Sequence, residues 1–91
     1  MSDETTGELE IVNDLGLHAR AASKLVKLAN GYDAEVWVGH DGREVNGKSI
    51  LGVLMLACAK GSTITLRCEG RQAAVAFQSL GDLVRDGFGE R

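Results

Sequence analysis

The sequence has few cysteines, no surplus of basic residues and no long apolar run, and each absence excludes a class of protein. A formal net charge of -3 argues against a nucleic-acid-binding protein, which would normally carry an excess of Lys and Arg. The one dense apolar run, at residues 50–59, is too short to cross a bilayer. The first eight residues are polar and acidic, so we expect neither a signal peptide nor a membrane anchor there.

The two cysteines, Cys58 and Cys68, lack the spacing of a metal site and lie in apolar segments. Such thiols are typical of reduced residues in or near the core of a cytosolic protein. We therefore expect a cytoplasmic protein with no metal and no bound cofactor. At 91 residues, without a linker or repeat, the chain predicts one domain over residues 1–91, with residues 1–7 as a flexible extension and a monomeric state.

The spacing of apolar residues predicts four strands and three helices. The strands are expected at residues 9–12, 34–39, 43–45 and 62–69, with Asp41-Gly42 as a hairpin turn. The helices are expected from His18 to about residue 29, over residues 50–59 with Gly61 as the stop, and over residues 71–85. The order βαββαβα predicts an α/β open-faced sandwich, in which three helices cover one face of a four-stranded antiparallel sheet.

His18 lies at the start of the first predicted helix, directly after a segment that contains Gly16. A helix N-terminus presents unpaired backbone N–H groups and the positive end of the helix dipole, so it favours an anion and disfavours protonation of a neighbouring histidine. A neutral imidazole beside an anion site is what accepting a phosphoryl group requires. The N–H groups near Ala19 and Arg20 would bind the phosphoryl oxygens, and the Arg20 side chain would neutralise charge during transfer.

Three motifs occur in order along the chain: GLHARAA at residues 16–22, GKSI at residues 47–50 and AKG at residues 59–61. With them, the chain from about Leu9 to the GFGE sequence at residues 87–90 resembles the HPr family of the phosphoenolpyruvate-dependent sugar phosphotransferase system. The resemblance implies the βαββαβα fold, a phosphoryl group on Nδ1 of His18, donation by enzyme I and transfer to enzyme IIA components. The chain departs from the family pattern at Ala21, where proline is commonest. Alanine is the best helix former, so we expect the helix to begin normally.

Ser49 has two compatible interpretations. As the N-cap of the second helix, it would contribute about 1 kcal/mol to stability. In the family that the chain resembles, the matching serine is phosphorylated in some bacteria by a dedicated HPr kinase. A phosphate there would place negative charge beside the patch that docks with enzyme I.

The second predicted helix is apolar around most of its circumference. We expect Val53, Leu56 and Ala57 to face the core, and the exposed remainder to form a docking patch for weak, transient partners. The patch consists of Ile50, Leu51 and Leu54. Lys24 and Lys27 of the first helix would steer acidic partners toward it, although an ordinary solvated helix face explains these two lysines equally well.

The leading hypothesis is a phosphocarrier, a phosphoryl-transfer intermediate rather than a stand-alone enzyme, because the sequence has no nucleotide-binding loop and no metal cluster. A rival is an NPr-type carrier of the nitrogen-related branch, which residues 33–36 and 54–56 favour, whereas residues 47–50 favour HPr. A third hypothesis is a regulatory interaction protein that signals through phosphorylated Ser49. The presence of His18 with Arg20 argues against that role as the only one.

Overall fold

The computed structural model describes residues 3–90 and has the element order expected from the sequence. Its strands are β1 (Glu4–Glu10), β2 (Glu35–His40), β3 (Arg43–Asn46) and β4 (Thr63–Glu69). Its helices are α1 (Ala19–Ala29), α2 (Ile50–Met55) and α3 (Ala73–Arg85), followed by a short 3-10 turn, η1 (Gly87–Gly89). The strands form one antiparallel sheet in the order β1-β4-β2-β3, so the predicted βαββαβα sandwich is confirmed.

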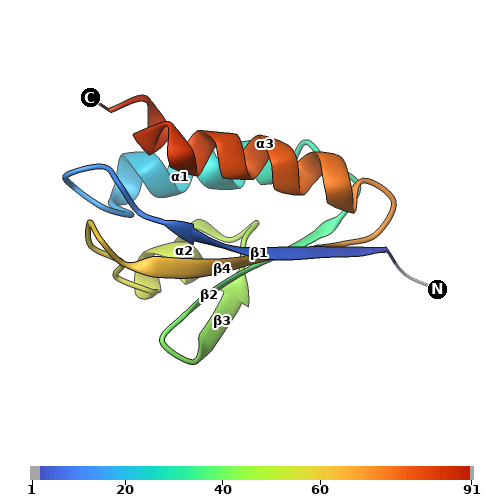
Figure 1. Ribbon diagram of the computed structural model, residues 1–91, viewed down its shortest axis with the longest axis horizontal. Helices are drawn as coiled ribbons and strands as arrows, with labels where there is room; N and C mark the ends of the chain where they lie inside the picture. Colours follow the sequence, from blue (N-terminus) through green and yellow to red (C-terminus); the bar gives the residue numbers. More distant parts are fainter. Residues whose placement is uncertain (1–2, 91) are drawn as a thin grey trace.

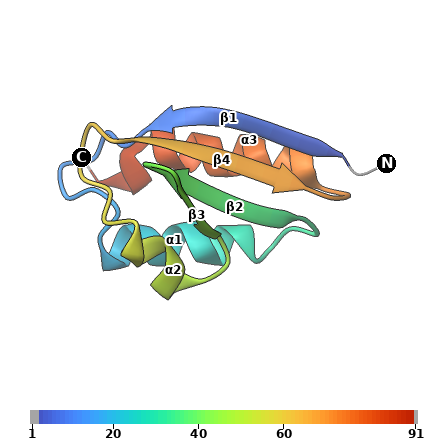
Figure 2. The ribbon, with the colours of Figure 1, turned by 90° about the horizontal axis from the view of Figure 1, so that it is seen from below.

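The helices and the sheet enclose a single apolar core. Helices α1 and α3 lie side by side over one face of the sheet (Figure 1), and α2 packs against α1 and β3 (Figure 2). Alternate residues of a strand point to opposite faces, so Ile64, Leu66 and Cys68 of β4 are buried while Thr63 and Thr65 are exposed. Within residues 3–90, the other face of the sheet carries no helix.

Strand β1 begins well before the predicted position. The expected flexible extension over residues 1–7 is wrong for residues 4–7, which pair with β4 from Glu4 opposite Glu69 to Gly7 opposite Leu66. Residues 1 and 2 lie outside the described residues. A strand on an open-faced sheet needs little apolar sequence, and Gly7 leaves room for the Phe77 ring, whose Cζ would lie 2.8 Å from a Cβ at this position.

Helix α2 ends earlier than predicted, at Met55 rather than Ala59. Ala57 adopts a left-handed conformation with φ 52° and is exposed, so the expectation that it faces the core is wrong. The following residues hydrogen-bond to the loop between β1 and α1, with Leu17 N donating to Cys58 O at 2.9 Å and Gly61 N donating to Ile11 O at 2.7 Å. The left-handed conformation of Ala57 turns the chain out of the helix, and these two hydrogen bonds hold the segment that follows against that loop.

Two further expectations concern the thiols and the membrane. Cys58 and Cys68 are free and buried, at 3% and 0% exposure, as predicted for reduced core residues. Over the part of the chain that the structure describes, no helix has the length and apolarity needed to cross a membrane.

Candidate functional site

The loop before α1 is fixed against the segment that follows α2. Gly16 has a φ of +66°, and a Cβ on it would lie 2.3 Å from the carbonyl oxygen of Cys58. Glycine is therefore required here both for its conformation and for the close backbone approach. The next residue, Leu17, is buried and hydrogen-bonded to Cys58 O, so His18 is presented from a rigid backbone at the start of α1.

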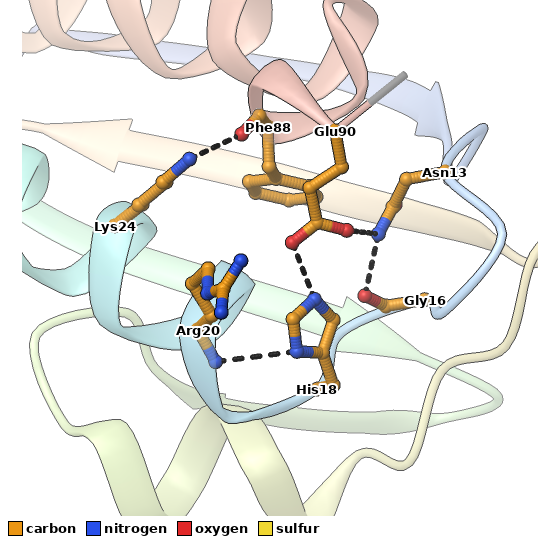
Figure 3. Close-up of polar contacts among 7 residues, drawn as sticks. All are labelled: Asn13, Gly16, His18, Arg20, Lys24, Phe88 and Glu90. Atoms are coloured by element: carbon orange, nitrogen blue, oxygen red, sulfur yellow. Dashed lines mark hydrogen bonds and ion pairs between the residues drawn. The ribbon is translucent and has the colours of Figure 1, made fainter.

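His18 is the N-cap of α1, and both of its ring nitrogens have partners (Figure 3). Nδ1 accepts a hydrogen bond from the backbone N–H of Arg20 at 3.3 Å. Nε2 lies 2.5 Å from Oε2 of Glu90. Because Nδ1 accepts, the ring proton is on Nε2 and is donated to the carboxylate. The Nδ1 lone pair therefore faces the N-terminus of α1.

Glu90 is held in turn by Asn13. The Asn13 side chain is almost fully buried, and its Nδ2 donates to Glu90 Oε1 at 3.0 Å and to Gly16 O at 2.8 Å. Burial alone would raise the pKa of Glu90, but hydrogen bonds from Asn13 and His18 and the charge of nearby Lys24 outweigh it and leave that pKa below its usual value. Glu90 is therefore an ionised acceptor at neutral pH.

The C-terminal segment reaches His18 through an unusual turn. Gly87, Phe88 and Gly89 all have positive φ, at 64°, 59° and 74°. Phe88 is fully buried, and its carbonyl oxygen accepts a hydrogen bond from Lys24 Nζ at 2.7 Å (Figure 3). The buried ring and the lysine together offset the cost of a left-handed phenylalanine and fix the position of Glu90.

An open depression of about 770 Å³ surrounds the His18 ring. Its lining residues come from the loop before α1, the first turns of α1 and the C-terminal segment: Asp14, Leu15, His18, Ala19, Arg20, Lys24, Gly89 and Glu90. Arg20 is exposed, and within residues 3–90 its guanidinium makes no ion pair. It extends beside the His18 ring, on the same side of α1 as Lys24 (Figure 3). The site thus combines an unprotonated ring nitrogen, a helix N-terminus and a cation that no internal pair restrains.

The predicted docking residues of α2 differ in their exposure to solvent. Ile50 and Leu51 are exposed, at 43% and 69%, as expected. Leu54 is half-buried and packs against the core, so its assignment to the water-facing side is wrong, whereas Met55 is 56% exposed and lies on that side instead. The reason is helical spacing, because Leu51 and Met55 are four residues apart and so lie on the same face of α2.

The two lysines and the serine also differ in their surroundings. Lys27 is exposed, but the ammonium of Lys24 is engaged by Phe88 O and so holds the C-terminal segment. Ser49 is the N-cap of α2, with its hydroxyl oxygen accepting from Gly52 N at 3.1 Å, so its predicted structural role is confirmed. Phosphorylation of Ser49 stays a prediction.

Sequence reasoning missed Asn13 and Glu90. Asn13 lies five residues before His18, and Glu90 lies 72 residues away from it along the chain. The signal that could have found Glu90 is the GFGE sequence, in which two glycines flank an aromatic residue. That pattern is compatible with a sharp left-handed turn buried by its central residue.

Comparison with known proteins agrees with this geometry. Residues 5–86 match the family model described as the PTS HPr component phosphorylation site. The phosphocarrier protein HPr of Neisseria meningitidis serogroup A is 49% identical over 82 residues, covering 90% of this chain and 92% of the relative. The phosphocarrier protein NPr of Shewanella violacea is 42% identical over 83 residues, covering 91% of both chains.

Among solved structures, HPr from Thermoanaerobacter tengcongensis superposes with a TM-score of 0.92 at 37% identity, covering 96% of this chain and 98% of that one. A family model that matches nearly the whole chain, together with relatives of this identity and coverage, leaves no ambiguity about the family. The chain belongs to the HPr family of phosphocarriers of the phosphotransferase system.

Proposed function

We propose that this protein carries a phosphoryl group on Nδ1 of His18, received from phosphorylated enzyme I and passed to enzyme IIA components. The observation that supports this most directly is the state of the His18 ring. Its Nδ1 is unprotonated and directed at the N-terminus of α1, while its proton is on Nε2. This arrangement offers the nucleophilic lone pair where a phosphoryl group would be stabilised.

The chain's own residues then perform three tasks during transfer. His18 supplies the lone pair that attacks phosphorus. The N–H groups of Ala19 and Arg20, at the start of α1, donate hydrogen bonds to phosphoryl oxygens, with the Arg20 N–H exchanging its present bond to Nδ1 for one of them. The Arg20 guanidinium neutralises the charge of the group as it arrives and leaves. Alignment and further charge neutralisation come from the partner enzyme.

Partner docking is assigned to the apolar surface of α2 beside this site. Ile50, Leu51 and Met55 are exposed there, and Lys27 of α1 adds positive charge. An exposed apolar cluster with a basic neighbour suits weak and rapidly exchanging contacts with acidic partner surfaces.

The sugar and nitrogen-related branches differ in the enzyme IIA that accepts the group. The relatives include proteins named HPr, at 42–49% identity, and a protein named NPr at 42% identity. Transfer from the phosphorylated protein to purified sugar-type and nitrogen-type enzyme IIA, measured side by side, discriminates the two.

The carrier function is tested by intact mass after incubation with phosphoenolpyruvate and enzyme I. We expect one acid-labile phosphoryl group on the wild-type protein and on His40→Ala, and none on His18→Ala. His40 is the matched control because it is the second of the two histidines and does not line the depression around His18. Absence of the group on the wild type with a competent enzyme I would refute the proposal, as would its persistence on His18→Ala.

A further inference from the structure

The proton on Nε2 of His18 is donated to the Glu90 carboxylate, and both oxygens of that carboxylate have a hydrogen-bond donor. Glu90 uses one oxygen for each of two donors: Oε1 accepts from Asn13 Nδ2 and Oε2 accepts from His18 Nε2. The Asn13 amide nitrogen has two hydrogens, and both are used, one toward Glu90 and one toward Gly16 O. The orientation of that amide is therefore fixed, and Glu90 always meets an N–H group there.

This arrangement requires a carboxylate rather than an amide. A glutamine at position 90 has only one acceptor oxygen. If that oxygen faced His18, the NH₂ group would meet the NH₂ group of Asn13, and if the amide were reversed, its NH₂ group would meet the Nε2–H of His18. Either orientation leaves two donors facing each other inside a site where Asn13 is 3% exposed and the Glu90 side chain 18% exposed.

From this geometry, and resting on the phosphocarrier function proposed above, we infer that Glu90 is a positioning residue that fixes the Nε2–H tautomer of His18. The partner contact at Nδ1 is a 3.3 Å hydrogen bond from a backbone N–H, which is weaker than the 2.5 Å contact to an ionised acceptor at Nε2. Glu90 therefore contributes the larger share of the tautomer preference. The buried Phe88 and the bond from Lys24 to Phe88 O hold the segment that carries it.

The chemical consequence is that transfer needs no proton movement on the ring. In the forward step, the bond from phosphorus to the donor breaks and a P–N bond forms at Nδ1, while Nε2 keeps its proton and the ring becomes cationic beside the Glu90 carboxylate. In the onward step, the P–N bond breaks and its electron pair returns to Nδ1, which regenerates the same neutral tautomer. A carrier that must accept and release the group with little loss of free energy benefits from this symmetry.

The inference is tested by the ¹⁵N NMR pattern of the His18 ring in the whole protein, recorded at a pH where the ring is neutral. The wild type should show an unprotonated Nδ1 and a protonated Nε2. In Glu90→Gln and Glu90→Ala, we expect the ratio of Nε2–H to Nδ1–H forms to fall about tenfold, the size that corresponds to about 1.4 kcal/mol for a lost charged hydrogen bond. Glu10→Gln is the charge-matched control, because Glu10 is exposed on β1.

A second readout separates positioning from folding or docking. With enzyme I as donor, Glu90→Gln should lower the turnover of phosphorylation while leaving KM for the carrier unchanged, since α2 is not altered. A Glu90→Gln ring pattern identical to that of the wild type would overturn the inference, as would a wild-type ring with its proton on Nδ1. If the tautomer shifts as expected but enzyme I never phosphorylates the wild type, the phosphocarrier function fails and the structural role of Glu90 stands.

Discussion

Replacing Gly16 by alanine should destabilise the protein by clearly more than the same change at Gly42. Both glycines have positive φ, +66° and +81°, so each alanine incurs the cost of a left-handed conformation, about 1–2 kcal/mol. Only Gly16 adds a collision, because its Cβ would lie 2.3 Å from Cys58 O and 3.0 Å from Ala59 Cα, whereas no atom lies within 4 Å of a Cβ at Gly42. Relief by a backbone shift costs about 1–3 kcal/mol more.

The two variants therefore separate the conformational cost from the collision. The expected loss is about 2–5 kcal/mol for Gly16→Ala and about 1–2 kcal/mol for Gly42→Ala, against a total stability of about 5–14 kcal/mol for a chain of this length. Urea denaturation followed by circular dichroism measures the loss of unfolding free energy for both variants. Thermal denaturation should show Tm lowered by roughly 4–8 °C for each kcal/mol lost. Equal losses for the two variants would refute the argument that the backbone contact with Cys58 determines the glycine at position 16.

Three further predictions concern a thiol, the docking surface and the C-terminal contact. Burial raises the pKa of Cys68 to about 11, so at pH 8 iodoacetamide should modify it at least about a hundredfold more slowly in the native than in the urea-unfolded protein, and equal rates would contradict its burial. Leu51→Asp should weaken binding to enzyme I by tenfold or more, whereas Val75→Asp on α3, also at an exposed apolar position, should not, as titration calorimetry would show. The pKa of Glu90 is lowered below 4.5, so its contact with the histidine should persist above pH 4.5 and be lost as the pH falls further through the folded-state pKa, which a pH series of NMR spectra would follow.

The order and type of the elements could be predicted from the sequence because they depend on local periodicity. The apolar positions of α1 at Ala22, Leu25, Val26 and Ala29 are all buried, and the alternation in β4 matches its two faces. The ends of elements were harder to predict, because they depend on contacts with distant parts of the chain. Helix α2 stops where Ala57 turns the chain out of it and the backbone that follows bonds to the loop before α1, and β1 starts early because β4 offers it a partner.

In the candidate site, too, features set by local sequence could be predicted, and features set by distant contacts could not. The position of His18 at a helix N-terminus follows from local sequence, and the structure places it there as the N-cap. The surroundings of Lys24 did not follow, since its ammonium could as well have remained in solvent. Its actual partner, Phe88 O, is 64 residues away and exists only because the C-terminal turn returns over α1.

Glu90 shows why the proposed nucleophile could be found from the sequence when the carboxylate that contacts it could not. A histidine followed by a helical pattern can be placed at a helix N-terminus from local sequence. A glutamate near the end of the sequence has no such local signal, because most glutamates are exposed to solvent. Three successive positive φ values and a buried phenylalanine are needed to bring the Glu90 carboxylate to Nε2. Such a turn is unfavourable in isolation and persists only because the surrounding packing determines it. Burial of the Phe88 ring offsets the cost of its left-handed conformation, and the same turn brings the Glu90 carboxylate to Nε2, so a packing contact in the core determines which residue contacts the His18 ring.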